Sequence, residues 1–273
     1  MATDNGRILF EKRNANMLFK YPRPASLQMV FGLAALLAAC AGGPPAPDWQ
    51  VNSAAHLRRY SQAWLKGNTR VAQHEFALAR QEAASTGQAV QVARVELTRC
   101  ALQAAALDFA PCEGFEALRA DAPPAETAYA AWLAGQAGAG EAALLPAAYR
   151  ALAAQGAGAP AQAAQAALQA IEDPVSRLVA AGVLMRQQRI SPGVAELAAQ
   201  TASAQGWRRP LLAWLGVQKR LAMQGGQAAE AARLQRQMDL VAAPDAAKAA
   251  QASGAPGGSG DSGDSGAPAA DGR

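Results

Sequence analysis

Small and aliphatic side chains recur every three or four residues along most of the chain, and polar side chains fill the positions between them. This spacing places the apolar residues on one face of an α-helix, because a helix has about 3.6 residues per turn. The segment 88–108 shows the pattern most clearly, with Val92, Ala93, Leu97 and Cys100 on a single face. The pattern therefore predicts helices rather than strands.

Glycine and proline residues interrupt the pattern at short intervals and predict where helices begin and end. Gly67 and Gly87 follow apolar runs and are typical of helix C-termini. Asp173 before Pro174 combines an N-cap residue with a first-turn proline, and Ser191 before Pro192 repeats that signal. The turns are short, so successive helices should be antiparallel neighbours. We expect about ten helices, over residues 53–66, 69–85, 88–108, 125–134 and 141–155, from Pro160, Pro174 and Pro192 onward, and over 207–223 and 227–241.

One of these predicted helix pairs resembles a known repeat. The segment 63–68 (AWLKGN), followed by Ala72, Phe76 and Ala79, resembles the second half of a tetratricopeptide repeat. In that family, small residues stand where two helices touch, and one large residue fills the groove between them. The resemblance implies an all-α solenoid of stacked antiparallel helical hairpins.

Partial copies of the same pattern occur at 226–231 and at 163–174, so the resemblance covers about half of the chain. The Leu-Gly pair of the family's first helix is absent from residues 53–66. Alanine-rich hairpins unrelated to the family are the alternative. In either case, we expect one helical-repeat domain over residues 52–242.

In tetratricopeptide-like solenoids, the first helix of each pair lines a concave groove. The resemblance therefore makes the polar residues of first helices candidates for contacting an extended peptide or a partner helix. These candidates are Arg58, Arg59, Gln62, Arg208 and Arg209. The alternative for each arginine is that it is simply solvated.

The N-terminal region has the order of an export signal. The run from Met29 to Gly43 is apolar, Lys20 and Arg23 precede it, and small residues stand before a candidate cleavage site. The apolar run is shorter than the roughly 18–20 residues that a membrane-spanning helix needs. We therefore expect residues 1–39 to be a signal peptide, with Met17 as the suspected true start.

A short motif at the end of this segment resembles the lipobox of bacterial lipoproteins: Leu37, Ala38, Ala39 and Cys40. The resemblance implies that Cys40 carries diacylglycerol and an N-terminal acyl chain, which together anchor a protein firmly. Ala41 stands where such lipoproteins commonly carry an Asp that retains them in the inner membrane. We therefore expect an outer-membrane lipoprotein of a Gram-negative bacterium that faces the periplasm, with residues 40–51 as a Pro/Gly spacer.

Composition narrows the class of protein and its partners. Hydrophobic residues make up 51% of the chain, but 73 of the 273 residues are alanine and only 5% are aromatic. Alanine is the strongest helix former, so an all-β fold is excluded. Residues 1–39 hold five basic and two acidic residues, so removing them lowers the net charge from +4 to +1. We therefore expect no nucleic-acid partner, since that function needs a concentrated basic face.

The C-terminal segment lacks the side chains that build a core. Residues 243–273 consist mainly of Gly, Ser, Ala and Asp, and no aliphatic or aromatic side chain larger than Ala follows Val241. Such a segment cannot bury enough apolar surface to offset the entropy of ordering it. We expect it to be a disordered tail.

The odd number of cysteines has a simple explanation if Cys40 is lipidated. Cys100 and Cys112 then remain in an oxidising periplasm, where two thiols close in sequence usually pair. A continuous helix would hold them about 18 Å apart, so the helix must end near Asp108 and Pro111 must help to turn the chain back. We expect a structural disulfide, because no Cys-x-x-Cys redox spacing is present.

Residue patterns for catalysis are weak. The two histidines, His56 and His74, lack the spacing of a zinc-protease helix, and neither shows a carboxylate partner at a known spacing. The Gly-Asp-Ser-Gly segments at 260–266 resemble a serine-protease nucleophile motif, but they lie in the low-complexity tail. We therefore expect no catalytic residues, no metal site and no cofactor apart from the lipid on Cys40.

Taken together, these features predict a lipid-anchored helical-repeat scaffold for protein–protein contacts in envelope assembly, with envelope proteins as partners. Three alternatives stay open. One is a chaperone-like periplasmic protein that binds peptides in transit. Another is an envelope spacer without a defined groove. The third is a cell-wall enzyme, which should show a deep cleft with converging carboxylates, whereas a scaffold should show a shallow open groove.

Overall fold

The computed structural model describes residues 45–136, 139–156 and 158–253, and all regular elements in these ranges are helices. The predicted all-α class is therefore confirmed for the described part of the chain. The predicted signal peptide, the motif at Leu37, Ala38 and Ala39, the lipidation site Cys40 and the tail beyond residue 253 lie outside the described residues. The helices belong to one compact unit that begins at Ala46.

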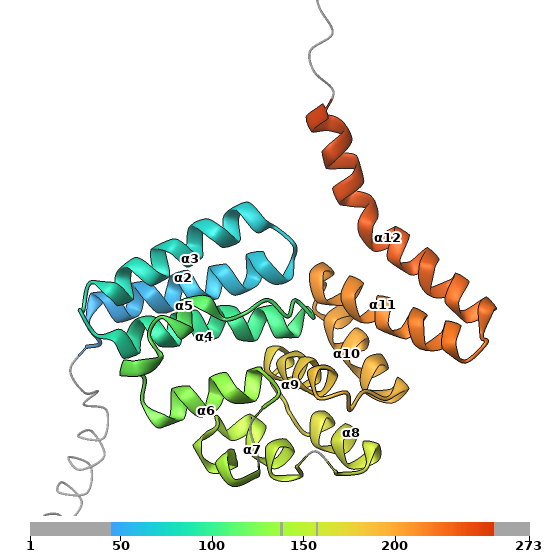
Figure 1. Ribbon diagram of the computed structural model, residues 1–273. Coiled ribbons are helices and arrows are strands. Elements are labelled where there is room, and N and C mark those ends of the chain that lie inside the picture. The colour runs from blue at the N-terminus through green and yellow to red at the C-terminus, as the bar shows by residue number, and fades with distance from the viewer. Residues whose placement is uncertain (1–44, 137–138, 157, 254–273) are drawn as a thin grey trace, which may run out of the picture. The chain divides into compact units, whose positions relative to one another are not determined.

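The first three long helices lie side by side (Figure 1): α2 (Asp48–Leu65), α3 (Thr69–Ala84) and α4 (Ala89–Ala105). A Schellman motif ends α2, in which the Asn68 amide donates to the Ala63 carbonyl at 2.8 Å. Gly67 takes the left-handed conformation that this motif requires, with φ of 86°. The short turn makes α2 and α3 an antiparallel hairpin.

The chain turns back after α4, as the cysteine spacing predicts. The helix ends at Ala105 rather than near Asp108, because Leu107 adopts a left-handed φ of 59°. The Asp108 amide then donates to the Gln103 carbonyl at 2.9 Å. This turn brings Cys112 back beside Cys100, where they form a disulfide with a Cα–Cα distance of 5.8 Å.

The middle of the body is built from short helices. They are α5 (Glu113–Glu116), η2 (Arg119–Asp121), α6 (Pro124–Leu133), η3 (Ala139–Leu144), α7 (Ala147–Ala154) and α8 (Ala161–Gln169). The single helix predicted over 141–155 is divided into η3 and α7. Pro146 stands between them at the N-cap of α7, where its missing N–H costs nothing.

Four longer helices complete the body: α9 (Pro174–Arg186), α10 (Pro192–Ala204), α11 (Arg208–Gln224) and α12 (Ala228–Ser253). The predicted caps of the first two are confirmed. The Asp173 carboxylate accepts from the Ser176 amide at 2.7 Å, and the Ser191 hydroxyl accepts from the Val194 amide at 3.3 Å. The last helix continues through Ser253, past the predicted start of the tail at residue 243, where alanine favours the helix.

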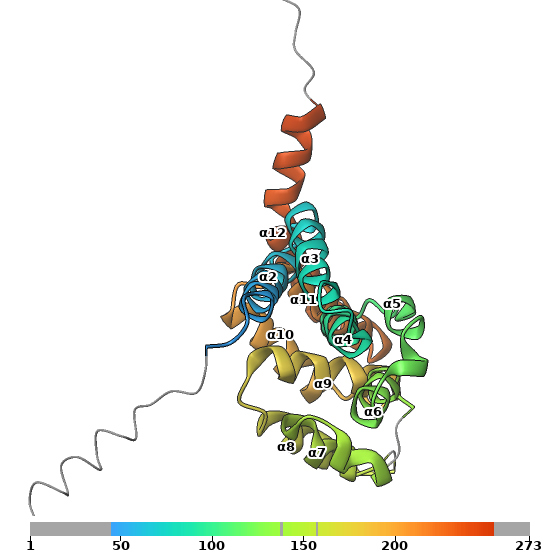
Figure 2. The same cartoon turned by 90° about the vertical axis from the view of Figure 1, so that its left-hand side faces the viewer.

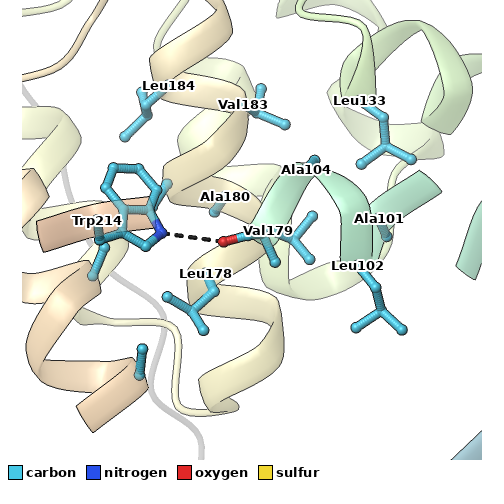
Figure 3. Close-up of a cluster of buried hydrophobic side chains, with 14 of the residues drawn as sticks. Ala101, Leu102, Ala104, Leu133, Leu178, Val179, Ala180, Val183, Leu184 and Trp214 are labelled. Carbon is cyan, nitrogen blue, oxygen red and sulfur yellow. Dashed lines mark hydrogen bonds between the residues drawn. The ribbon is translucent and has the colours of Figure 1, made fainter. Parts of the chain in front are cut away.

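The core lies where α4 and α9 pack against each other, and α11 closes it from one side (Figures 1 and 2). The fully buried Trp214 of α11 donates its indole N–H to the carbonyl of Ala105 at 3.1 Å (Figure 3). This bond satisfies one of the carbonyls that the end of α4 leaves without a helical partner. Contacts between α4 and α9 and between α2 and α11 join helices that are far apart in sequence.

Within the described ranges, no helix combines the length and the apolar character that crossing a bilayer requires.

Candidate binding surface

Four of the five predicted binding residues line one groove. The groove, which we call the basic groove, has a volume of about 1060 Å³ and lies between the second half of α2, the start of α3 and the start of α11. Arg58, Arg59 and Gln62 enter it from α2, and Arg208 enters it from α11. The turn between α2 and α3 faces the start of α11 (Figure 1), so the fold joins segments about 140 residues apart in sequence.

Arg209 has a different place from the one predicted. Its Nε donates to the Trp64 carbonyl at 2.8 Å, its Nη2 donates to the Thr69 hydroxyl at 2.8 Å, and its guanidinium lies 4.0 Å from the centre of the Trp64 ring. These three contacts hold the start of α11 against the first hairpin. Arg209 does not line the basic groove. The neighbouring Arg208 does line it, and its Nε donates to the Val241 carbonyl at 3.2 Å.

Lys66 and Arg70 also line the groove, although sequence reasoning did not select them. Both stand at the turn between α2 and α3, one at the end of the first helix and the other at the start of the second. Only their spacing around the predicted turn at Gly67 could have indicated that they share a surface with Arg58. With Arg58, Arg59 and Arg208, they bring the number of cationic lining side chains to five.

Glu75 is the one carboxylate among the lining residues, and it is already engaged. Its Oε2 lies 2.7 Å from His56 Nδ1 and accepts from Arg59 Nε at 2.8 Å. The hydrogen bond to His56 has the largest effect in lowering the pKa of Glu75. The hydrogen bond and the charge of Arg59 lower this pKa further. Sequence reasoning assigned no carboxylate partner to His56, because Glu75 comes from the facing helix. The basic groove therefore keeps a strong excess of positive charge.

Two helices begin at the basic groove. The α3 helix begins at Thr69 and the α11 helix at Arg208, and neither has a side-chain hydrogen bond at its N-cap. The first amide N–H groups of a helix carry a partial positive charge and lack partners within the helix. The start of α3 therefore offers amide donors to the groove, and the C-terminus of α2 beside it carries the opposite partial charge.

A second cleft, which sequence reasoning missed, has a volume of about 540 Å³ and lies between α4, α6, α7 and α9. We call it the tyrosine cleft, because Tyr129 of α6 and Tyr149 of α7 lie in its wall with their rings stacked 5.8 Å apart. Trp132 stacks behind Tyr149 at 4.3 Å. Burial raises the pKa of both tyrosines, so their hydroxyls stay protonated at neutral pH.

The polar groups of the tyrosine cleft are largely paired with protein. Arg94 Nε donates to Glu126 Oε1 at 2.7 Å, and Arg150 Nε donates to the Leu145 carbonyl at 2.8 Å. The remaining wall is mainly aliphatic, with Leu97, Ala101, Leu102, Val175 and Val179 among its residues. This cleft offers apolar and aromatic contacts, whereas the basic groove offers charge.

Neither cleft brings two carboxylates together. Glu126 is the sole acidic residue that lines the tyrosine cleft, and Glu75 is the sole acidic residue that lines the basic groove. Each of them forms an ion pair with an arginine. His74 of α3 is exposed. Within the described ranges, no three His, Cys, Asp or Glu side chains are grouped as a metal site.

Comparison with known proteins gives this chain no relative: no family model, no curated protein and no solved structure matches it.

Proposed function

We propose that this protein is a lipid-anchored lipoprotein of the outer membrane, and that its helical body holds a partner protein of the bacterial envelope from the periplasmic side. The lipobox-like motif that ends at Cys40 supports the anchor. The disulfide between Cys100 and Cys112 supports an oxidising compartment, because reducing compartments rarely preserve such bonds.

The basic groove is the observation that carries the binding role. It is open, it is formed by side chains from both ends of the helical body, and it collects four of the five residues that a solenoid model selects. Grooves of this kind in stacked helical hairpins serve as extended binding surfaces. Binding rather than catalysis is the function that such a surface supports best.

A tetratricopeptide-like solenoid is the arrangement that we propose for the body. The hairpin of α9 and α10 begins at Pro174 and the hairpin of α11 and α12 begins at Arg208, which is 34 residues later. This interval equals the length of a tetratricopeptide repeat. The contacts between α2 and α11 and between α4 and α9 depart from a strictly linear stack, in which each hairpin contacts only its neighbours.

A chaperone-like peptide binder is the second candidate, and the tyrosine cleft is the observation that favours it. Its aliphatic and aromatic walls suit an apolar peptide segment better than the charged basic groove does. A scaffold and a peptide binder differ in the number of partners, since a scaffold captures one defined protein and a chaperone captures many.

The test of the proposed function is crosslinking in the native bacterium, followed by identification of the captured proteins. We expect one defined envelope protein, captured in the membrane fraction by the wild-type chain. The Cys40→Ala variant should leave the membrane fraction and lose this capture. A wild-type chain that stays in the soluble fraction, or that captures no protein reproducibly, would contradict the proposal.

A further inference from the structure

The basic groove also indicates the chemistry of its ligand. We propose that it binds an acidic, extended peptide segment of the partner protein, in which Asp or Glu carboxylates contact the arginines of α2 and α3. This inference rests on the proposed function and adds to it the class of segment that the partner must present.

Positive charge without ion-pair partners is concentrated in the basic groove. Arg58, Lys66 and Arg70 are exposed and form no ion pair with any other residue of the described ranges. They lie within 13 positions of each other in a chain whose predicted mature form has a net charge of only +1. The basic groove therefore has a local excess of positive charge. Like charges held close together repel, and a bound anion relieves that repulsion.

The shape and chemistry of the groove cations suit a carboxylate ligand. An arginine guanidinium presents parallel N–H groups that match the two oxygens of a carboxylate. The amide N–H groups at the uncapped start of α3 offer further donors to the same anion. The groove is thus built from donors, which suits a ligand that supplies acceptors.

The other lining residues favour a peptide over a lipid headgroup. The groove wall also holds the amide of Gln62, the hydroxyl of Thr69 and the half-exposed side chain of Val71, which suit the backbone and side chains of a peptide. Arg58 and Lys66 lie about 15 and 27 Å along α2 from its first residue, and the lipid anchor precedes that residue. The groove therefore lies at the C-terminal end of α2, whereas the chain leads from Cys40 into the N-terminal end of this helix.

The experiment measures fluorescence anisotropy of a labelled peptide of alternating Glu and Gly, titrated with the full chain in nonionic detergent. The matching peptide of Gln and Gly serves as the probe control. Removing one exposed cation should raise the dissociation constant about threefold. The Arg58→Gln/Arg70→Gln variant should therefore weaken binding of the Glu peptide about tenfold.

The matched protein control is the Arg220→Gln/Arg236→Gln variant, which removes the same charge from exposed positions outside the groove. Its dissociation constant for the Glu peptide should be within about twofold of the wild-type value. Salt should weaken peptide binding by the two proteins to the same extent. Equal loss in the two variants would overturn the inference, because the attraction would then reflect net charge alone. Equal binding of the Glu and Gln peptides would also overturn it.

Two further outcomes would assign a different ligand to the basic groove. If the Glu peptide fails to bind but phosphatidylglycerol vesicles bind in an Arg58- and Arg70-dependent manner, the ligand is a lipid headgroup. If replacing Asp261, Asp264 and Asp271 by Asn strengthens Glu-peptide binding about tenfold, the chain's own acidic tail is the occupant. Either result overturns the inference. The proposed function would survive both, provided that crosslinking in cells still captures one envelope protein.

Discussion

Replacing Gly182 by alanine tests the packing of α4 against α9, on which the core depends. Gly182 is buried in α9, and a Cβ at this position would lie 2.1 Å from the carbonyl oxygen of Ala104 and 2.7 Å from its carbonyl carbon. Both atoms belong to the backbone of α4, so no side-chain rotation can make room. The two helices would have to separate.

The expected change in the free energy of unfolding follows from two opposing effects. Overpacking of a rigid contact costs about 3 kcal/mol at the upper end of its usual range, while alanine gains about 1 kcal/mol over glycine as a helix former. The net loss of about 2 kcal/mol should lower the melting temperature by roughly 4–8 °C for a body of this size. We expect circular dichroism to show this shift under non-reducing conditions.

Gly216 provides the matched control, because it lies in the interior of a helix without such a contact. The nearest atom to a Cβ at Gly216 is Met238 Cε at 3.9 Å, an ordinary van der Waals distance. Gly216→Ala should therefore raise the melting temperature by roughly 2–4 °C through helix propensity alone. If Gly182→Ala melts at or above the wild-type temperature, α9 does not approach α4 through this glycine.

Three further predictions follow from local geometry. Gln188 adopts a left-handed φ of 57°, so Gln188→Gly should stabilise the protein by about 1 kcal/mol in urea unfolding; an unchanged midpoint would contradict the assigned backbone. Reducing the Cys100–Cys112 disulfide, which closes a short loop, should cost about 3 kcal/mol in the same assay, and Cys112→Ala should be insensitive to reductant. Because the pKa of Glu75 is lowered in the folded state, its ion pairs stabilise the protein above the unfolded pKa of about 4.3 and lose that effect as pH falls. Glu75→Gln should therefore lose less stability than wild type when denaturation midpoints are compared between pH 6 and pH 3.

The fold class was predictable because helix periodicity and helix ends are local properties. Gly67 and Gly87 end helices with positive φ, and the caps at Asp173 and Ser191 form as their sequence signals indicate. The end of α4 was placed three residues too late, since Leu107 takes a conformation for which its side chain gives no signal. A non-glycine residue in this region is held there by the surrounding contacts rather than by its own preference.

The candidate site was predictable in part, because the tetratricopeptide resemblance selects polar residues on the first helix of each hairpin. Arg58, Arg59 and Gln62 of α2 and Arg208 of α11 line one groove, as that resemblance implies. The tyrosine cleft was missed because its two tyrosines come from different helices, and apolar periodicity assigns both of them simply to the core. A pairing of aromatic rings across helices depends on helix packing, which short-range sequence patterns do not describe.

The position of α11 shows how one long-range contact decides both the fold and the groove. Two adjacent arginines begin this helix with the same local signal, yet Arg209 binds the carbonyl of Trp64 while Arg208 lines the groove. Neighbouring residues of a helix point about 100° apart, so fixing one of them against the first hairpin directs the other toward the opening. The contact that joins the two ends of the helical body therefore also supplies the fifth cation of the basic groove. Loss of the Arg209 contact should therefore weaken binding of an acidic peptide to the basic groove, even though Arg209 does not line the groove.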